Sequence, residues 1–315
     1  MKIDVVGFGA LNYDYIFVVD KLASGNQQVI IKQALGTPGG SSANTIYSLS
    51  KLGIKTGFFG AVGDDVEGVQ IKSQMQEVGI DISRIRKVPS KATSKVFVFV
   101  DRSGERAMYS LPGASTSFRV NKSDIIWLSD KKFIIISSAP GKEILNEQKN
   151  LIANIKKSTK TIFIPGALYA RYGFSELEPI LTKSDIVILN SRETLELTGR
   201  KFQVGAKWLI KKGCKMVVIT LGRQGCFIYY SKKSRIIPTI KLSDNKIVDS
   251  TGAGDAFAAG LVYGLLNKFP LSKAALLGNL NARFCIQGLG ARSGLPDEIT
   301  LINEFRKYSK VVENE

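Results

Sequence analysis

Strand-like and helix-like segments alternate along most of this 315-residue chain, and this alternation limits its fold more than any other feature. Short runs rich in β-branched residues predict buried strands at Ile3–Val6, Phe133–Ser137, Thr161–Ile164, Ile186–Leu189 and Met216–Thr220. Helical spacing of apolar residues recurs at Ser42–Leu52, Val69–Val78, Ile144–Lys157, Gln203–Lys212 and Ala253–Leu266. Such alternation predicts an α/β protein whose central sheet is mainly parallel and covered by helices on both faces.

Two regions break the alternation and predict paired strands with little helix between them. They are Tyr15–Val19 with Gln28–Gln33, and Ser94–Asp101 with Arg106–Leu111. Ser103-Gly104 is typical of a hairpin turn. We expect a small antiparallel sheet, formed by about residues 12–35 and 92–113, that projects as a lid from a single domain spanning residues 1–315. We expect the end of the chain, Ser309–Glu315, to fray.

The absence of histidine narrows the chemistry, because it excludes Ser-His-Asp and Cys-His nucleophile activation and every His-ligated metal site. A general base must therefore be a carboxylate, Lys, Tyr or Cys. Three widely spaced cysteines, Cys214, Cys226 and Cys285, fit neither a disulfide framework nor a zinc site.

Charge and hydropathy bear on partners and location. Lys and Arg number 44 against 27 Asp and Glu, a formal net charge of +17, but the basic residues are scattered as pairs. Because there is no basic run and no RNA-binding aromatic signature, we expect no nucleic-acid partner. The basic residues are expected to solvate the faces of helices and the ends of strands, and the alternative is that they attract anionic small molecules. No apolar run approaches the roughly 18 residues of a membrane helix, and no signal peptide precedes the first strand. We expect a cytoplasmic protein without membrane contact.

Two familiar phosphate-binding motifs are absent. Gly7-Phe8-Gly9 follows the first strand, but Asn12 stands where a dinucleotide fingerprint has its third glycine, and GxxxxGK[ST] does not occur. Rossmann dehydrogenases and P-loop NTPases are therefore disfavoured. Gly39-Gly40-Ser41-Ser42-Ala43-Asn44 opens a helix, with Asn44 directed back toward a cleft, although an ordinary capped helix start would look much the same.

The strongest signal is Val248–Phe257, where a strand end runs through small residues into a long helix. Successive amides of Gly252, Ala253 and Gly254 at a helix N-terminus form an anion site. Asp255 lies in the same turn, where it would repel that anion. Its position is explained if it takes the proton of a substrate hydroxyl that attacks phosphorus; the alternative is a first-turn acid that interacts with the helix dipole.

These two segments resemble the signatures of the ribokinase-like (PfkB) carbohydrate and nucleoside kinases. Asp249–Phe257 is similar to the family's C-terminal signature, and Gly39–Asn44, about 210 residues earlier, to its N-terminal one. The resemblance covers essentially the whole chain. It implies a three-layer α-β-α fold with a sheet of about nine strands, a β-lid over the sugar site, and phosphoryl transfer from ATP with Mg²⁺ to a hydroxymethyl group.

The resemblance also implies roles for individual residues. Asp255 resembles the catalytic base and Gly252–Gly254 the anion hole. The residues that would bind the acceptor's hydroxyls are Asn12, Asp14, Gly40 and Asn44. The residues that would bind ATP are Asn190, Thr220, Gly222, Gly225 and Asn279. Glu193 would act on the metal through water, and Asp249 with the Gly288–Gly294 loop matches a monovalent-cation (K⁺) site, where Arg292 could supply the charge instead.

Structural alternatives remain for several of these residues. Asn12 and Asp14 could shape a turn, Glu193 could begin a helix, and Thr220–Gly225 could be a plain strand-to-strand turn. Arg102 and Arg106 flank the hairpin turn, where we expect solvent exposure rather than phosphate binding.

The sequence constrains the identity of the phosphoryl acceptor less than it constrains the reaction. No compact Lys/Arg cluster accompanies the substrate motifs, which disfavours a sugar-phosphate kinase. Aromatic residues that could stack a base are frequent near them: Phe8, Tyr13, Tyr15, Phe17, Phe97, Phe99, Tyr169 and Tyr172. The layout also resembles archaeal nucleoside kinases, so we favour a nucleoside kinase; the alternatives are ribokinase or another free-sugar kinase, and a non-catalytic sugar-binding protein. We expect a homodimer through the lid, because its bare edges invite pairing.

Overall fold

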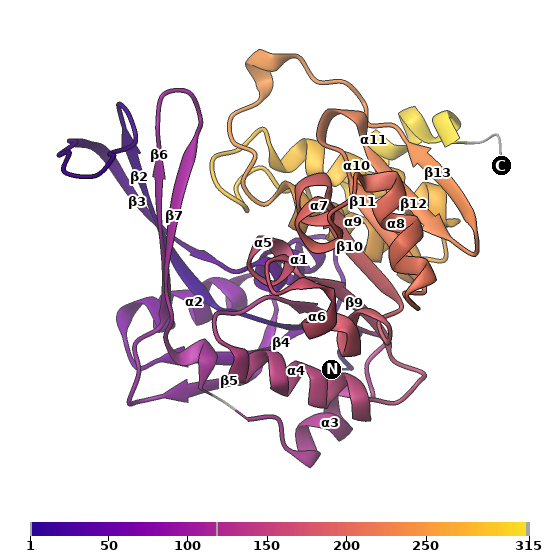
Figure 1. The fold of residues 1–315 in the computed structure, drawn as a ribbon, viewed down its shortest axis with the longest axis horizontal. Helices are drawn as coiled ribbons and strands as arrows, with labels where there is room; N and C mark the ends of the chain where they lie inside the picture. Colours follow the sequence, from indigo (N-terminus) through magenta and orange to yellow (C-terminus); the bar gives the residue numbers. More distant parts are fainter. Residues whose placement is uncertain (1, 118, 313–315) are drawn as a thin grey trace.

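The computed structural model describes residues 2–117 and 119–312, and its alternating strands form one nine-stranded sheet (Figure 1). The strands are β1 (Val5–Phe8), β4 (Thr56–Gly63), β5 (Asp81–Val88), β8 (Phe133–Ser137), β9 (Lys160–Ile164), β10 (Ile186–Asn190), β11 (Met216–Thr220), β12 (Cys226–Tyr230) and β13 (Lys233–Ile237). Their order is β13-β12-β11-β10-β9-β8-β1-β4-β5. Pairs from β11 to β5 are parallel, whereas β12 and β13 add antiparallel strands at one edge.

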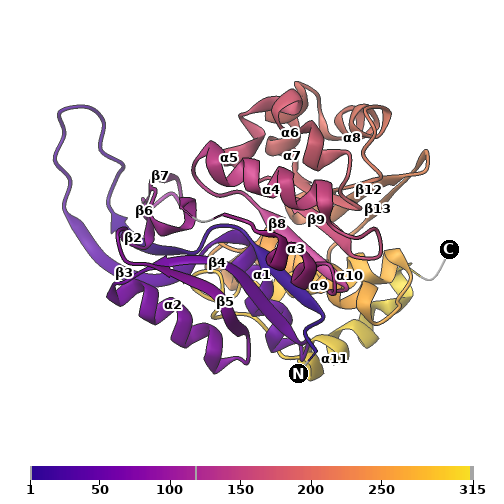
Figure 2. The ribbon, with the colours of Figure 1, turned by 90° about the horizontal axis from the view of Figure 1, so that it is seen from below.

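Helices cover both faces of this sheet, as parallel strands require (Figure 2). The first face carries α1 (Ser41–Lys51), α2 (Val66–Glu77), α9 (Ala253–Leu266), α10 (Leu271–Cys285) and α11 (Glu298–Tyr308). The second carries α3 (Lys122–Leu128), α4 (Lys142–Asn154), α5 (Gly166–Ala170), α6 (Gly173–Leu181), α7 (Ser191–Thr198) and α8 (Phe202–Lys211). The predicted three-layer α-β-α architecture is confirmed. No helix in these described ranges combines the length and apolarity needed to cross a bilayer.

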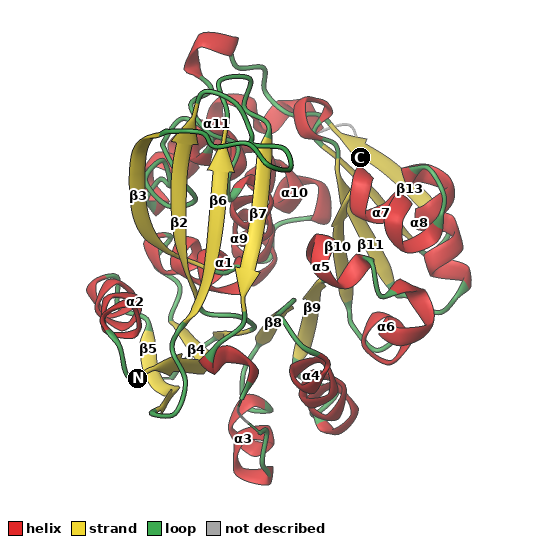
Figure 3. Ribbon diagram, turned by 60° about the vertical axis from the view of Figure 1, so that its left-hand side comes forward, coloured by secondary structure: helices red, strands yellow, loops and turns green. Residues whose placement is uncertain are grey.

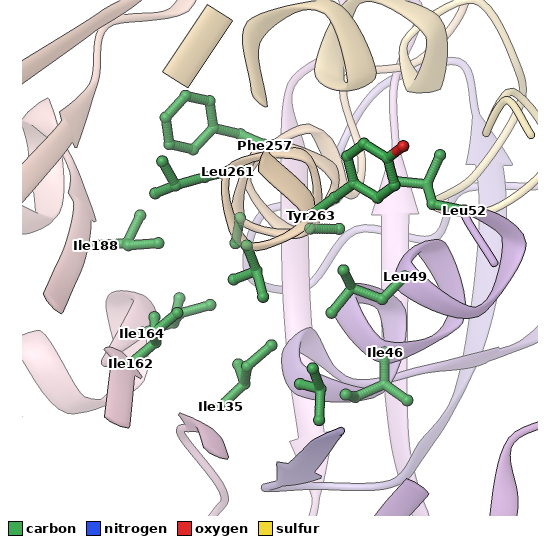
Figure 4. Packing of buried hydrophobic residues seen from close by; sticks show 14 of the residues in the cluster. Ile46, Leu49, Leu52, Ile135, Ile162, Ile164, Ile188, Phe257, Leu261 and Tyr263 are labelled. Carbon is green, nitrogen blue, oxygen red and sulfur yellow. The ribbon is translucent and has the colours of Figure 1, made fainter. Parts of the chain in front are cut away.

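The core divides between the two faces because strand side chains alternate. Ile135 of β8 belongs to the cluster of the first face, and its neighbours Ile134 and Ile136 belong to that of the second. On the first face, Phe257 of α9 and Ile46 of α1 pack within the same cluster as the sheet residues (Figure 4). This packing holds the N-termini of both helices at the carboxyl edge of the sheet, where ligands bind in α/β folds.

A second, four-stranded sheet rises from the body (Figure 3). It consists of β2 (Asn12–Val19), β3 (Ile31–Gly39), β6 (Ser94–Val100) and β7 (Arg106–Leu111), in the order β3-β2-β6-β7. We call this sheet the lid. Its outer pairs are antiparallel as expected, but the central pair β2–β6 is parallel. The expectation of a purely antiparallel sheet is wrong, because β2 and β6 both leave the body outward and the chain returns through β3 and β7.

Four predicted segments are confirmed residue for residue: Phe133–Ser137, Met216–Thr220, Arg106–Leu111 and Ala253–Leu266. Strands β4, β5, β12 and β13 were not predicted. Among the predicted segments β3 differs most, because it pairs with β2 as far as Asn12 and so extends to Gly39. At the end of the chain, where fraying was expected, Ser309–Val312 forms a short 3₁₀ helix, and residues 313–315 lie outside the described ranges.

Candidate active site

Two cavities meet at the N-terminus of α9. The first, of about 600 Å³, is lined by Thr220, Gly222, Arg223, Gly225, Thr239, Ile240, Lys241, Leu242, Ile247, Ser250, Ala253, Gly254, Phe257, Asn279, Ala282, Arg283 and Ile286. The second, of about 560 Å³, lies under the lid and includes Asn12, Asp14, Gly40, Ser41, Asn44, Arg106 and Asp255. Ile247 and Ser250 line both. We call the first cavity the body cavity and the second the lid cavity.

The turn before α9, at residues 250–254, lies between the two cavities. Gly252 has a φ of +77°, and a Cβ added there would lie 2.6 Å from the Cα of Ala291, so this position requires glycine. Ala253 and Gly254 face the body cavity, while Thr251 and Asp255 face the lid cavity. The amides at a helix N-terminus lack partners within the helix and attract anions. The Ala253 amide makes a long contact of 3.3 Å with the Ser250 carbonyl oxygen.

Asp255 is held by two donors from α1. The Ser41 hydroxyl donates to Oδ1 at 2.6 Å and the Asn44 amide donates to Oδ2 at 3.1 Å. Burial raises the pKa of Asp255 to about 6, although both hydrogen bonds and the charge of Arg292 oppose this rise. A carboxylate with such a pKa is ionised at neutral pH and still able to accept a proton, as a general base must be.

The start of α1 requires glycine. Gly40 precedes it with a φ of +107°, and a Cβ there would lie 2.2 Å from the Ala10 carbonyl oxygen. This close approach lets Ser41 and Asn44 reach Asp255 across 214 and 211 residues of sequence. Asn44 does point toward the lid cavity, as predicted, and the structure adds that its side-chain amide contacts Asp255.

Asn12 and Asp14 lie on β2 and face the lid cavity. Oδ1 of each is buried and has no hydrogen-bond partner in the described part of the chain. Burial raises the pKa of Asp14 to about 7, with Arg292 lowering it and Asp255 raising it. Buried oxygens without partners are rare, and a ligand's hydroxyl groups would satisfy them.

Four of the residues predicted to bind ATP line the body cavity, namely Thr220, Gly222, Gly225 and Asn279; their role toward ATP stays a prediction. The Asn279 amide donates to the carbonyl oxygens of Ile237 and Pro238, at 3.0 and 3.1 Å. Asn279 therefore also holds the end of β13.

Asn190 and Glu193 form a capping box at the start of α7 instead of lining either cavity. The Glu193 amide donates to Asn190 Oδ1 at 2.8 Å, and the Asn190 amide donates to Glu193 Oε2 at 2.9 Å. Burial, together with the negative charge of Asp255, raises the pKa of Glu193. This matches the alternative of a helix-start acid, and a role toward metal or nucleotide stays a prediction.

Asp249 is already engaged on both oxygens. Oδ1 accepts from the amide and hydroxyl of Thr251, at 2.9 and 2.7 Å, and Oδ2 accepts from the Gly290 amide at 2.9 Å. Arg106 of the lid reaches the same carboxylate at 2.8 Å and also donates to Ser250 and Thr251. A cation at Asp249 would have to displace this guanidinium, so the residues fit K⁺ poorly. Arg106 is exposed as a residue, as expected, but its side chain is only 27% exposed, lines the lid cavity and pairs with Asp249.

Comparison with known proteins agrees with this geometry. The family model described as pfkB family carbohydrate kinase matches residues 2–298. The chain belongs to the pfkB family. An uncharacterized sugar kinase of Archaeoglobus fulgidus is 32% identical over 80% of this chain and 99% of its own length. A nucleoside kinase of Methanocaldococcus jannaschii is 26% identical over 98% and 97%.

Solved structures show the same fold. Arabidopsis thaliana ribokinase, complexed with ribose and ATP, superposes with a TM-score of 0.85 at 21% identity, covering 97% of this chain and 99% of that one. The crystal structure of the M. jannaschii nucleoside kinase gives 0.82 at 23% identity, covering 97% and 99%. The ribokinase-like fold is thus confirmed, and this pfkB-family chain is an ATP-using phosphotransferase that acts on a small-molecule sugar or nucleoside.

The aromatic residues expected to stack a base do not line the lid cavity of this kinase. Tyr15 stacks on Phe97 and Phe17 on Phe99, with ring centroids 5.8 and 5.1 Å apart, on the opposite face of the lid. Strand alternation explains the difference, since the cavity receives the residues between them, such as Ile16 and Val98.

Sequence reasoning missed three residues of the site. Ser41 donates a hydrogen bond to Asp255, Arg106 joins the lid to Asp249, and Gln74 of α2 accepts a hydrogen bond from Arg292. Ser41 could have been noticed from its place in the Gly39–Asn44 motif. No local pattern brings α2 or the lid hairpin to this site.

Proposed function

We propose that this kinase transfers the γ-phosphoryl group of ATP to the hydroxymethyl group of a nucleoside, with Asp255 as the general base. The observation that carries the proposal is the gradient of polarity in the lid cavity. Along β2 the cavity-facing residues change from Asn12 and Asp14 near the body to Ile16 and Val18 toward the tip. The paired residues of β6 continue the apolar surface, with Val98 opposite Ile16 and Val100 opposite Val18.

This gradient matches the two halves of a nucleoside. The sugar hydroxyls would satisfy the orphaned oxygens of Asn12 and Asp14, while the base would cover the apolar surface around Ile16 and Val98. A free pentose carries hydroxyl groups around its whole ring, and burying those against aliphatic side chains without partners is costly.

The residues of this chain supply positioning and charge for in-line transfer. Asp255 removes the proton of the attacking hydroxyl, and its carboxylate is aimed by Ser41 and Asn44. The amides of Gly252–Gly254 face the phosphoryl group from the turn between the cavities and stabilise its negative charge. The lid covers the acceptor and excludes water that would otherwise hydrolyse ATP.

Magnesium fits this site as an ion held mainly by the nucleotide. The described residues contain no group of three or more His, Cys, Asp or Glu side chains that could hold a metal ion, and Mg²⁺ commonly binds phosphates and water with one or two carboxylates. Glu193 would contact it through water, and Mg²⁺ would neutralise charge on the phosphate oxygens.

The principal alternative is a ribokinase or another free-sugar kinase such as a fructokinase. A sugar-phosphate acceptor has one observation in its favour, Arg106 in the lid cavity, but that guanidinium is already paired with Asp249. A non-catalytic sugar-binding protein would have no need of a carboxylate held as Asp255 is.

An ATP-consumption screen across nucleosides, pentoses, hexoses and sugar phosphates tests the proposal. A nucleoside should give the highest kcat/KM; a free pentose or hexose in that place would refute it and support the alternative. A matched pair of variants sharpens the result. Met108 on β7 and Ile126 on α3 have similar exposure, 65% and 69%, and only Met108 lines the lid cavity. Met108→Gln should raise the KM for the nucleoside about five-fold, for a loss of about 1 kcal/mol of apolar contact, whereas Ile126→Gln should leave it unchanged.

We further propose a homodimer through the lid and a cytoplasmic location. The lid edges β3 and β7 expose Leu35, Tyr109 and Leu111, at 39%, 63% and 52%. Unpaired strand edges and exposed apolar side chains favour association, and a second copy of the same lid would cover both.

A further inference from the structure

Arg292 is a buried cation with an unusual set of partners. It lies in the loop between α10 and α11, is 7% exposed, and pairs with no carboxylate in the described part of the chain. Its Nε donates to Asn44 Oδ1 at 2.9 Å, its Nη1 donates to Gln74 Oε1, and its guanidinium lies 4.8 Å from the centre of the Tyr47 ring. Nη2 is buried without a partner among the described residues. Burying a charge without a salt bridge is costly, so it points to a function.

The hydrogen bonds around Asn44 form a directed chain. A guanidinium only donates and a carboxylate only accepts. Asn44 contacts Arg292 through Oδ1 and Asp255 through Nδ2, so one orientation of its amide satisfies both neighbours. Exchanging the oxygen and nitrogen of this amide would place two donors together at Arg292 and two acceptors together at Asp255. Arg292 thus determines which group Asn44 presents to the base.

The charge of Arg292 acts on two carboxylates at once. It lowers the pKa of both Asp14 and Asp255, against burial that raises them. The other charged groups nearby are acidic or already paired: Glu193 on α7, and Asp249, which binds Arg106. The thiol of Cys285 on α10 is buried and its pKa is raised to about 12, so it carries no charge at neutral pH.

We propose that Arg292 is a positioning residue of the phosphoryl transfer: through Asn44 it orients the Asp255 carboxylate, and its positive charge stabilises the negative charge of Asp255 and Asp14 beside it. The proposal rests on the proposed role of Asp255 as base. It does not depend on which acceptor is used.

The test compares Arg292→Met, which removes charge and donors, with Arg292→Lys, which keeps the charge, and Gln74→Ala, which only loosens the guanidinium. Arg84→Gln is the matched control, since Arg84 pairs with Asp124 away from both cavities. The readout is the pH profile of kcat/KM for the acceptor, and in particular the pH at which its acidic limb falls to half of the maximum. Arg292→Met should move it upward by about one pH unit, because losing an opposite charge favours the neutral acid. The kcat/KM should then fall about five-fold more at pH 6 than at pH 8.

Arg292→Lys should have the acidic limb of the wild type but a lower kcat, since an ammonium group cannot orient the Asn44 amide as the guanidinium does. Gln74→Ala should shift the limb in the same direction as Arg292→Met, by less. The KM for ATP should stay within two-fold in all variants. An unshifted limb with kcat within two-fold in Arg292→Met overturns the proposal; if that variant does not fold, the same result in both Arg292→Lys and Gln74→Ala does so.

A measurement without turnover separates this proposal from the proposed function. Carboxyl ¹³C shifts of labelled aspartates, assigned with Asp14→Asn and Asp255→Asn, report both titrations in the free protein. Shifted titrations in Arg292→Met support the coupling even if the screen finds a sugar as acceptor. Unchanged titrations refute it even if the nucleoside proposal holds.

Discussion

Replacing Asp255 by Asn separates catalysis from binding and from stability. Asn retains the shape of the side chain: its Oδ1 can accept from the Asn44 amide, and its Nδ2 can donate to the Ser41 hydroxyl, which can rotate to accept. The geometry should therefore survive while the proton acceptor is lost. Since a positioned base contributes about 10²–10⁴-fold, kcat should fall by that factor. ATP binding should change by less than a few-fold, because the body cavity does not include Asp255.

The same substitution has a consequence for stability, with a defined sign. The folded-state pKa of Asp255 is about 6 against 3.8 for the unperturbed group, so the folded protein favours the protonated form. Ionised Asp255 therefore destabilises the fold, and this penalty grows as pH rises from 3.8 through 6. About two pKa units correspond to at most about 3 kcal/mol, which partial contact with solvent reduces to about 1–2 kcal/mol. Asp255→Asn should be more stable than the wild type by that amount at pH 8.

Steady-state kinetics, calorimetric ATP titration and thermal unfolding at pH 4 and pH 8 check these expectations. The stability difference should shrink toward zero at pH 4, where the wild-type carboxyl is already protonated. Asp14→Asn serves as the comparison, because it neutralises a neighbouring buried carboxylate without touching the proposed base. If Asp255→Asn keeps more than about a third of wild-type turnover, the assignment of Asp255 as the base is refuted. Equal stability of Asp255→Asn and the wild type at pH 8 would refute the electrostatic reasoning.

Three further predictions concern the lid. Asp14→Ala should raise the acceptor KM tens-fold with little change in the KM for ATP, because charge-assisted bonds to hydroxyls contribute about 1.5–3 kcal/mol each; the reverse pattern in steady-state kinetics would place it in the donor site. Since Arg106 occupies the Asp249 carboxylate, replacing K⁺ by choline should change turnover less than two-fold, whereas Arg106→Ala should create stimulation by K⁺; strong K⁺ dependence of the wild type contradicts this. Tyr109→Glu with Leu111→Glu should yield monomers with weakened acceptor binding, and light scattering that shows a wild-type monomer at micromolar concentration would exclude the lid dimer.

The sequence predicts the body of this protein better than its lid cavity. Periodicity is local, and it identified α9 and β11 to the residue because buried segments carry unbroken apolar patterns. Motif spacing led to Asp255 and to the helix that holds Asn44, since each motif is a contiguous stretch of chain. The prediction that aromatic residues of the lid stack a base was wrong. Which side chains of a strand face the cavity depends on the strand's register, and the sequence alone left that register open by one residue.

Contacts between distant segments could not be predicted in the same way. Arg292 and Gln74 are 218 residues apart, and Arg106 and Asp249 are 143 apart. The family resemblance placed the loop of Arg292 near a cation site, but nothing in the sequence marks Gln74 as the partner of Arg292 or Asp249 as the partner of Arg106. These contacts arise from the packing of α2 and the lid against the body, which is a property of the assembled fold.

Both ends of the β2–β3 arm of the lid are anchored at the reacting centre. Asn12 begins β2 four residues after β1 ends, and β3 ends at Gly39, next to the glycine that opens α1. Asn12 and Asp14, which would bind the acceptor, thus belong to the lid, and β3 of the lid leads directly into α1, whose Ser41 and Asn44 hold Asp255. An open molecule would have no assembled acceptor site waiting to be filled. Measured acceptor affinity would therefore depend on the position of the lid as much as on the strength of the individual contacts.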